Sequence, residues 1–184
     1  MKKVALLTVA MLCVASLAFA QAGSIGIYGD ALGTDCYISD SIPGLLNVYV
    51  VHVNTPAATA SQFSVPTPAC FLAPFLSSSS PFPVAIGNPA TGIAIGYGGC
   101  FTGPIHVLTL QYFAQGLTGP CCFIDVFPDV TLSDIQVVDC ASNLLAATAL
   151  NGVVNGDGSC ECGIPPTVPT QDTTWGQMKA LYSD

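Results

Sequence analysis

The two histidines, His52 and His106, are the residues best suited to acid–base chemistry, and the chain has no others. Beside a serine and an aspartate, either could serve as the general base for a nucleophilic attack. Both lie inside apolar stretches typical of β-strands, and the chain has no Gly-x-Ser-x-Gly nucleophile motif. We therefore interpret them as packed or rim histidines and expect no catalytic residue.

A pair of carboxylates, Asp125 and Asp139, offers another route to hydrolysis. Two such groups on either side of a glycosidic bond can act as acid and as base or nucleophile, at a separation that the fold determines. We keep a hydrolase as the outsider among the possible functions. The expectation is a non-enzymatic protein without a cofactor.

Calcium is the metal that the acidic turns suggest. Asn155 and Asp157 resemble the middle of an EF-hand or dockerin loop, which places oxygen ligands at positions 1, 3, 5 and 12. Position 1 would be Val153 and position 12 would be Ile164, so two main ligands are missing and a hairpin turn is favoured. Three more aspartates fall in one predicted loop region, where bonding to turn amides is the commoner role: Asp30, Asp35 and Asp40.

The cysteines predict a disulfide framework. Eight of the nine follow the first 20 residues, and an even number in an exported chain indicates paired bridges. A zinc site is disfavoured, because matched C-x₂₋₄-C pairs are absent. Adjacent cysteines on a strand should bond in opposite directions. The expected bridges join Cys36 to Cys70, Cys100 to Cys121 or Cys122, and Cys140 to Cys160 or Cys162.

The N-terminus has the order of a secretory signal peptide. Lys2 and Lys3 precede an uncharged apolar run, and Ala18-Phe19-Ala20 supplies a small-residue cleavage site. Processing is therefore expected after Ala20. No later stretch is apolar for long enough to span a bilayer. The sequence thus predicts export to a bacterial periplasm or cell surface, with no transmembrane anchor after cleavage.

Charge narrows the range of partners. The chain has 11 acidic and 3 basic residues, and loss of Lys2 and Lys3 would leave a formal charge of −10. Phosphate groups of nucleic acids and anionic lipids are bound through Lys and Arg, so neither is an expected partner. Acidity instead favours solubility, a cation or a basic partner.

Short β-strands must position all of these groups. The strongest pattern is 45–53, followed by 105–113 and the glycine-rich 92–99. Both faces of 45–53 are apolar, so its second face needs a cover from the proline-rich loop, the C-terminal tail or another chain. Weaker strands are expected at 24–28, 60–65, 122–127 and 132–139, whereas 144–154 suits a helix or a strand.

About eight or nine strands with turn-rich connections predict an all-β fold, an antiparallel β-sandwich stabilised by disulfides. The order of features is similar to the cohesin and carbohydrate-binding-module type of sandwich. It comprises a strand at 48–53, the segment 60–63, a strand at 107–110, and 134–139 followed by a turn and a closing strand. The resemblance covers residues 24–158 and transfers no binding residue.

Two regions outside the strongest strands could contact partners. Residues 66–83 carry five prolines and the rings of Phe71, Phe75 and Phe82, which form a binding surface or, as we favour, a lid on the core. The β domain spans 21–162, and a proline-rich linker at 163–172 follows it.

The last segment, 173–184, places Trp175 and Tyr182 on one side of a predicted short amphipathic helix. Its Trp-Gly-x-x-Lys-x-Leu-Tyr pattern is similar to endings of exported bacterial proteins. We expect a secreted or cell-surface interaction or adhesion module that binds a protein or polysaccharide. The alternatives are a carbohydrate-binding module and a self-assembling structural subunit.

Overall fold

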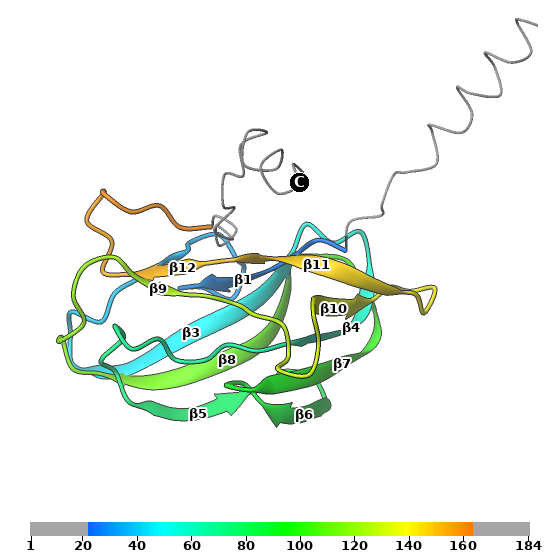
Figure 1. Cartoon of the computed structure of the whole chain (residues 1–184), viewed down its shortest axis with the longest axis horizontal. Coiled ribbons are helices and arrows are strands. Elements are labelled where there is room, and N and C mark those ends of the chain that lie inside the picture. The colour runs from blue at the N-terminus through cyan, green and yellow to red at the C-terminus, as the bar shows by residue number, and fades with distance from the viewer. Residues whose placement is uncertain (1–21, 164–184) are drawn as a thin grey trace, which may run out of the picture.

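The structure, a computed structural model, describes residues 22–163 (Figure 1). The predicted signal peptide, the linker after Gly163 and the predicted helical tail lie outside the described residues. Within 22–163 all regular structure is β, so no helix there could cross a membrane. The strands of this part are β1 (Ser24–Tyr28), β2 (Tyr37–Ile38), β3 (Gly44–Val53), β4 (Ala58–Phe63), β5 (Phe75–Ser79), β6 (Val84–Asn88), β7 (Gly92–Phe101), β8 (Ile105–Ala114), β9 (Cys122–Ile124), β10 (Ile135–Val138), β11 (Leu144–Leu150) and β12 (Gly152–Val154).

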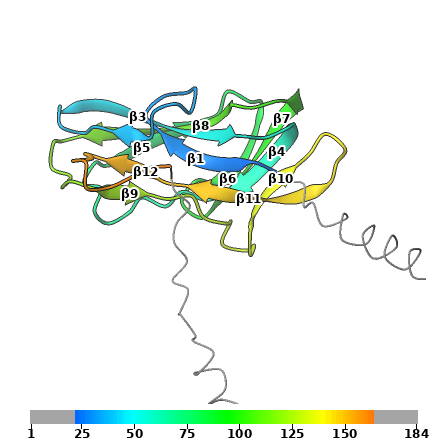
Figure 2. The same cartoon turned by 90° about the horizontal axis from the view of Figure 1, so that it is seen from above.

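Nine strands form one large sheet in the order β5-β8-β3-β1-β11-β10-β4-β7-β6, and a small sheet has the order β2-β12-β9. The large sheet curls around the core (Figures 1 and 2). The pair β1–β11, which is parallel, joins its two antiparallel halves. The expected all-β fold is confirmed. The described strands nevertheless make a large curled sheet and a small one, each with a parallel pair, and not the purely antiparallel sandwich that we expected.

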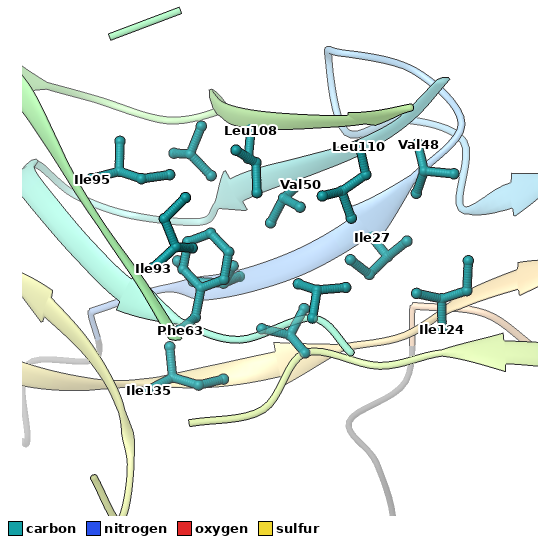
Figure 3. Packing of buried hydrophobic residues seen from close by; sticks show 14 of the residues in the cluster. Ile27, Val48, Val50, Phe63, Ile93, Ile95, Leu108, Leu110, Ile124 and Ile135 are labelled. Atoms are coloured by element: carbon teal, nitrogen blue, oxygen red, sulfur yellow. The ribbon is translucent and has the colours of Figure 1, made fainter. Parts of the chain in front are cut away.

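The core lies between the two halves of the large sheet (Figure 3). Val48 and Val50 of β3 and Leu108 and Leu110 of β8 point inward from one half, and Phe63 from the other. All are fully buried, and truncation of an aromatic side chain such as Phe63 to Ala in this setting costs about 3–5 kcal/mol. Alternation along β3, β7 and β8 thus positions the core as predicted.

The segment after Pro66 differs from the predicted loop. It contains β5, and the next strand, β6, follows shortly afterwards. The prolines do not interrupt these strands but flank them: Pro74 and Pro81 stand on either side of β5, and Pro83 and Pro89 on either side of β6. Proline is tolerated at strand ends and on sheet edges, and both strands are edges. The ambiguous 144–154 region forms β11 and β12 and no helix.

The segment between β1 and β2 covers one end of the second face of β3, at Val51 and Val53, and leaves Leu45 and Asn47 outward. Val51 and Val53 pack there with Tyr28 and Cys36. Gly33 has φ of +69°, and a methyl group at this position would lie 2.9 Å from a Val53 methyl carbon, so the backbone itself makes the contact. Of the candidates for this cover, the proline-rich loop is wrong for Val51 and Val53, and the tail lies outside the described residues.

The expected cysteine pairing is wrong in every bridge. The disulfides are Cys36–Cys162, Cys70–Cys122, Cys100–Cys140 and Cys121–Cys160. The expected bridges join near neighbours in sequence, whereas the sheet topology brings distant segments together, with separations up to 126 residues. The adjacent Cys121 and Cys122 bond to distant segments, Cys121 to Cys160 and Cys122 to Cys70. Only Cys122 lies on a strand, since Cys121 precedes β9 with φ of +59°, so the strand alternation that we expected does not apply to the pair.

Three of the bridges meet around the small sheet. Cys36 precedes β2, Cys122 begins β9, and Cys160 and Cys162 follow β12. The strands of this sheet have only two or three residues, too few for independent stability. The bridges fasten these strands while Ile124 and Val154 join the main core. The small sheet therefore closes one end of the molecule.

Candidate interaction surface

His52 is a structural residue. It is fully buried on β3, with Nε2 2.6 Å from the Ala22 carbonyl oxygen and Nδ1 3.3 Å from the Tyr97 hydroxyl. Because a carbonyl oxygen only accepts, Nε2–H donates to Ala22 and the Tyr97 hydroxyl donates to Nδ1. Burial lowers the pKa of His52 and raises the pKa of Tyr97. The His52 ring thus links Ala22, at the start of the described residues, to β3 in one half of the large sheet and to Tyr97 of β7 in the other half.

His106 lies on the other face of the sheet. It pairs in register with Val51, whereas His52 pairs with Ile105. Its Nε2 is 2.9 Å from Thr109 Oγ1, and its ring meets the edge of Tyr49 at a centroid distance of 5.3 Å. Partial burial lowers the pKa of His106. The two histidines consequently share no site, and among residues 22–163 no Ser-His-Asp arrangement forms around either.

The aspartates considered for hydrolysis lie in different surroundings. Asp139 accepts bonds from the Asn143 amide side chain, the Asn143 N–H and the Ala141 N–H in the β10–β11 turn, and the first of these is the main reason that its pKa is lowered. Asp125 follows β9 in the small sheet's connection, where burial raises its pKa. The Asp139 carboxylate therefore accepts hydrogen bonds that stabilise the β10–β11 turn and does not lie beside Asp125 as the second group of a hydrolytic pair.

The calcium candidates belong to two separate networks. The side-chain amide of Asn155 donates to Asp40 Oδ1 and to the Thr118 carbonyl, and its oxygen accepts from the Asp40 N–H at 3.1 Å. Asp40 is fully buried beneath it. Asp157 instead accepts from the Ser159 N–H and hydroxyl. Their oxygens do not converge on a common point.

The remaining acidic groups also bond to turns. Asp30 accepts from the N–H groups of Leu32 and Asp35 at 2.7 and 2.6 Å, and Asp35 accepts from the Tyr37 N–H. A cluster of potential ligands does occur at Cys121, Asp157 and Cys160, but the two sulfurs form a disulfide and offer no thiolate.

The aromatic candidates divide between core and surface. Phe71 is buried against Tyr112 with ring centroids 4.8 Å apart, and Phe82 packs on Tyr97 at the same distance. Both act as a lid on the core. Phe75 is 47% exposed and touches Tyr112 only by its edge. Trp175 and Tyr182 lie outside the described residues.

A feature that the sequence analysis missed is the distribution of charge. No Asp, Glu, Lys or Arg occurs from residue 41 to residue 124. This span supplies β3 to β9 and thus both edges of the large sheet. The composition total hides it, because an average over the chain does not show where charges are absent. Two surfaces are built on this uncharged span.

The first surface is formed by outward side chains of β3, β5 and β8. Ser77 donates to Gln111 Oε1 at 2.8 Å, and Gln111 donates in turn to Asn47 Oδ1 at 3.3 Å. Beside this row, Leu45 pairs across the strands with Phe113, and they are 64% and 46% exposed. We call this surface the amide face: Leu45, Asn47, Tyr49, Ser77, Gln111 and Phe113.

The second surface is a shallow apolar hollow of about 140 Å³ on the outside of the other half. Small residues of β4 and β7 make its floor, and larger side chains of β6 and β11 make its walls. We call it the edge groove, lined mainly by Ala60, Val84, Ile86, Ala94, Gly96 and Leu144. Both surfaces combine exposed apolar side chains with few charges, a combination typical of interaction sites; the carboxylate bonded to a groove residue is that of Asp129, which accepts from the Gln62 side chain at 3.0 Å.

A comparison with protein-family models gives no match, and a search of curated proteins gives no similar sequence. The candidate surface therefore rests on the geometry described above.

Proposed function

We propose that this protein is a secreted or cell-surface interaction module without enzymatic activity. The observation that carries the proposal is the uncharged span from 41 to 124, which places exposed apolar side chains on the amide face and the edge groove of a strongly acidic protein. The negative charges on the rest of the molecule repel other acidic molecules, whereas the amide face and the edge groove can be contacted by an uncharged partner. The aspartates of the described turns accept hydrogen bonds from turn N–H groups and so stabilise the fold, and in residues 22–163 they form no acid–base pair.

Export to the periplasm or cell surface is supported by two independent features. The first is the Lys-Lys, apolar run and Ala-x-Ala order at the N-terminus. The second is the set of four disulfides, which suggest an oxidising setting outside the cytoplasm. We propose further that the curled sheet serves as a β-sandwich of the cohesin and carbohydrate-binding-module type, with residues 173–184 as a separate docking tail.

A binding measurement with cell envelopes from the source organism tests the module. The labelled protein, processed after Ala20 and oxidised, should bind saturably. The double change Leu45→Lys and Phe113→Lys should weaken binding at least tenfold, since it puts charge on the amide face. Ile42→Lys with Val130→Lys, at loop sites 81% and 73% exposed, adds the same charge; it is the matched control and should bind like the wild type. Absence of saturable binding, or equal binding by all three proteins, would refute the proposal.

A second candidate function is the binding of a neutral polysaccharide. The amide face favours it, because amide and hydroxyl groups lie beside the rings of Tyr49 and Phe113 on a sheet surface free of charge. Sugars combine such hydrogen bonds with stacking on aromatic rings. In titration calorimetry, neutral glycans should bind and Tyr49→Ala should weaken them. Binding of acidic glycans alone would contradict this ligand class.

A further inference from the structure

The two edges of the large sheet are not equally protected. β5 has a register shift between Phe75 and Ser77. β6 pairs with β7 in unbroken register, from Val84 opposite Gly96 to Asn88 opposite Gly92. A β-bulge hinders the addition of another strand, so β6 is the more open of the two edges of the large sheet.

The chemistry of β6 is that of an unguarded edge. All five of its residues, Val-Ala-Ile-Gly-Asn, are exposed, and none is charged. Proteins commonly protect a sheet edge with lysine, another charge or an internal proline. Here the prolines stand outside the strand, and the groups facing away from β7 have no strand neighbour in the described part of the chain. A further strand could therefore pair along β6.

We propose that β6 is a self-association site, where a second copy of the chain adds its own β6 in antiparallel orientation. The molecule is strongly acidic overall, and the Asp129 carboxylate lies beside Gly92 at the Asn88 end of β6. A basic partner would therefore be drawn to that end and to the other charged turns, and away from the uncharged segment 84–86. A neutral apolar strand is the complementary partner, and β6 itself is one. Antiparallel pairing of identical strands also satisfies the two-fold symmetry of a closed dimer.

The antiparallel register that places the apolar side chains of the two β6 strands opposite each other is centred on Ala85. It sets Val84 against Ile86 of the second copy and Ile86 against Val84 of the second copy. These side chains, 47% and 69% exposed, wall the edge groove. Pairing would cover them with apolar surface and continue the groove across the symmetry axis. The contact is small, which predicts a reversible dimer and not an obligate one.

The inference rests on the proposed function of an interaction module and names a second copy as one partner. Sedimentation velocity of the processed, oxidised protein across the micromolar range tests it. We expect a monomer–dimer equilibrium that Ile86→Lys and Val84→Lys each weaken at least tenfold in Kd. Ile42→Lys, an equally apolar site 81% exposed in a loop, is the control and should dimerise like the wild type. Leu144→Lys, on the opposite wall of the groove, should also leave the equilibrium unchanged.

Three outcomes overturn the self-association site: a wild-type monomer throughout the range, a dimer that Ile86→Lys does not weaken, or equal weakening by Leu144→Lys, which would indicate contact through the groove face. Hydrogen exchange on the wild type gives a readout without mutation, because amides of Val84–Asn88 should gain protection as concentration rises. A monomer that still binds envelopes through the amide face would overturn this site and leave the proposed function intact.

Discussion

At the scale of single residues, His52 makes the stability of the fold depend on pH. Burial lowers its pKa, while the unfolded chain keeps an ordinary value of about 6.5. Above this pH the imidazole is neutral in both states. Below it the unfolded chain binds a proton that the folded protein takes up only at lower pH, so the free energy of unfolding should fall as the pH drops from 6.5. Denaturant unfolding at successive pH values measures the slope.

His52→Leu and His106→Leu separate the contributions of the two histidines. The first change should flatten the slope below pH 6.5, and at pH 7 it should cost about 1–3 kcal/mol because the Ala22 carbonyl and the Tyr97 hydroxyl lose their partner. The half-buried His106 should affect the slope less. An unchanged slope in His52→Leu would show that the buried imidazole is not the titrating group.

The buried pair of Asp40 and Asn155 gives a second test at this scale. Asn155→Gly removes the amide that bonds to Asp40 and suits the positive φ of 53° at this position, so backbone strain does not obscure the result. We expect a loss of about 1–3 kcal/mol in the free energy of unfolding, since the carboxylate stays buried with fewer donors. The same network predicts no change of Tm on adding calcium or a chelator. A Tm lowered by the chelator would restore the calcium interpretation.

At the scale of elements, the disulfides differ in the loops that they close. Cys36–Cys162 spans 126 residues and Cys100–Cys140 spans 40. In the chain-entropy account, the longer loop contributes about 1 kcal/mol more to the free energy of unfolding. Replacing Cys36 and Cys162 with Ser should therefore destabilise the protein more than the same change at Cys100 and Cys140. It should also free the segment that covers Val51 and Val53.

Guanidinium unfolding without reductant compares the two double variants. The Val153 N–H donates to the Cys36 carbonyl oxygen, and Tyr37, next to Cys36, packs over Gly156. Loss of the Cys36–Cys162 bridge should loosen these contacts of β2 and therefore also raise the hydrogen-exchange rate of the Val153 amide. Equal stability of the two variants would mean that strain or residual structure outweighs loop entropy.

The same elements show what a sequence can predict here. The alternation of Ile93, Ile95 and Tyr97, or of Leu108 and Leu110, is local and predicts strands directly. The strands β5 and β6 were missed because proline was counted without regard to position. Bridges such as Cys36–Cys162 depend on the parallel pairing of β2 with β12, and no local pattern specifies that pairing.

At the scale of the whole molecule, the candidate surfaces depend on where charge is absent. The aromatic residues chosen from the proline-rich segment lie mainly in the core, as Phe71 does, because ring content alone does not distinguish a lid from a binding surface. The uncharged span from 41 to 124 can be read from the sequence alone, but the strand order is needed to show that both edges of the large sheet fall within it. The register that joins Asn47, Gln111 and Ser77 into one row could come only from the strand order.

This separation of charge from apolar surface predicts association in acid. At neutral pH the acidic groups limit association to the reversible dimer, whereas near the pI, which is about 4.1 for the full chain and lower once Lys2 and Lys3 are removed, the net charge vanishes and further uncharged surfaces can meet. Hydrogen bonds lower the pKa of turn carboxylates such as Asp139 and Asp157, and in each case the bond from a side-chain donor has the largest effect. These groups therefore stay ionised at lower pH than an ordinary aspartate. Light scattering should thus stay low from pH 7 to about 5 and rise close to the pI. Ile86→Lys with Leu45→Lys should reduce the rise more than Ile42→Lys with Val130→Lys, which adds the same charge at loop sites. Equal scattering by both pairs would attribute the association to net charge alone.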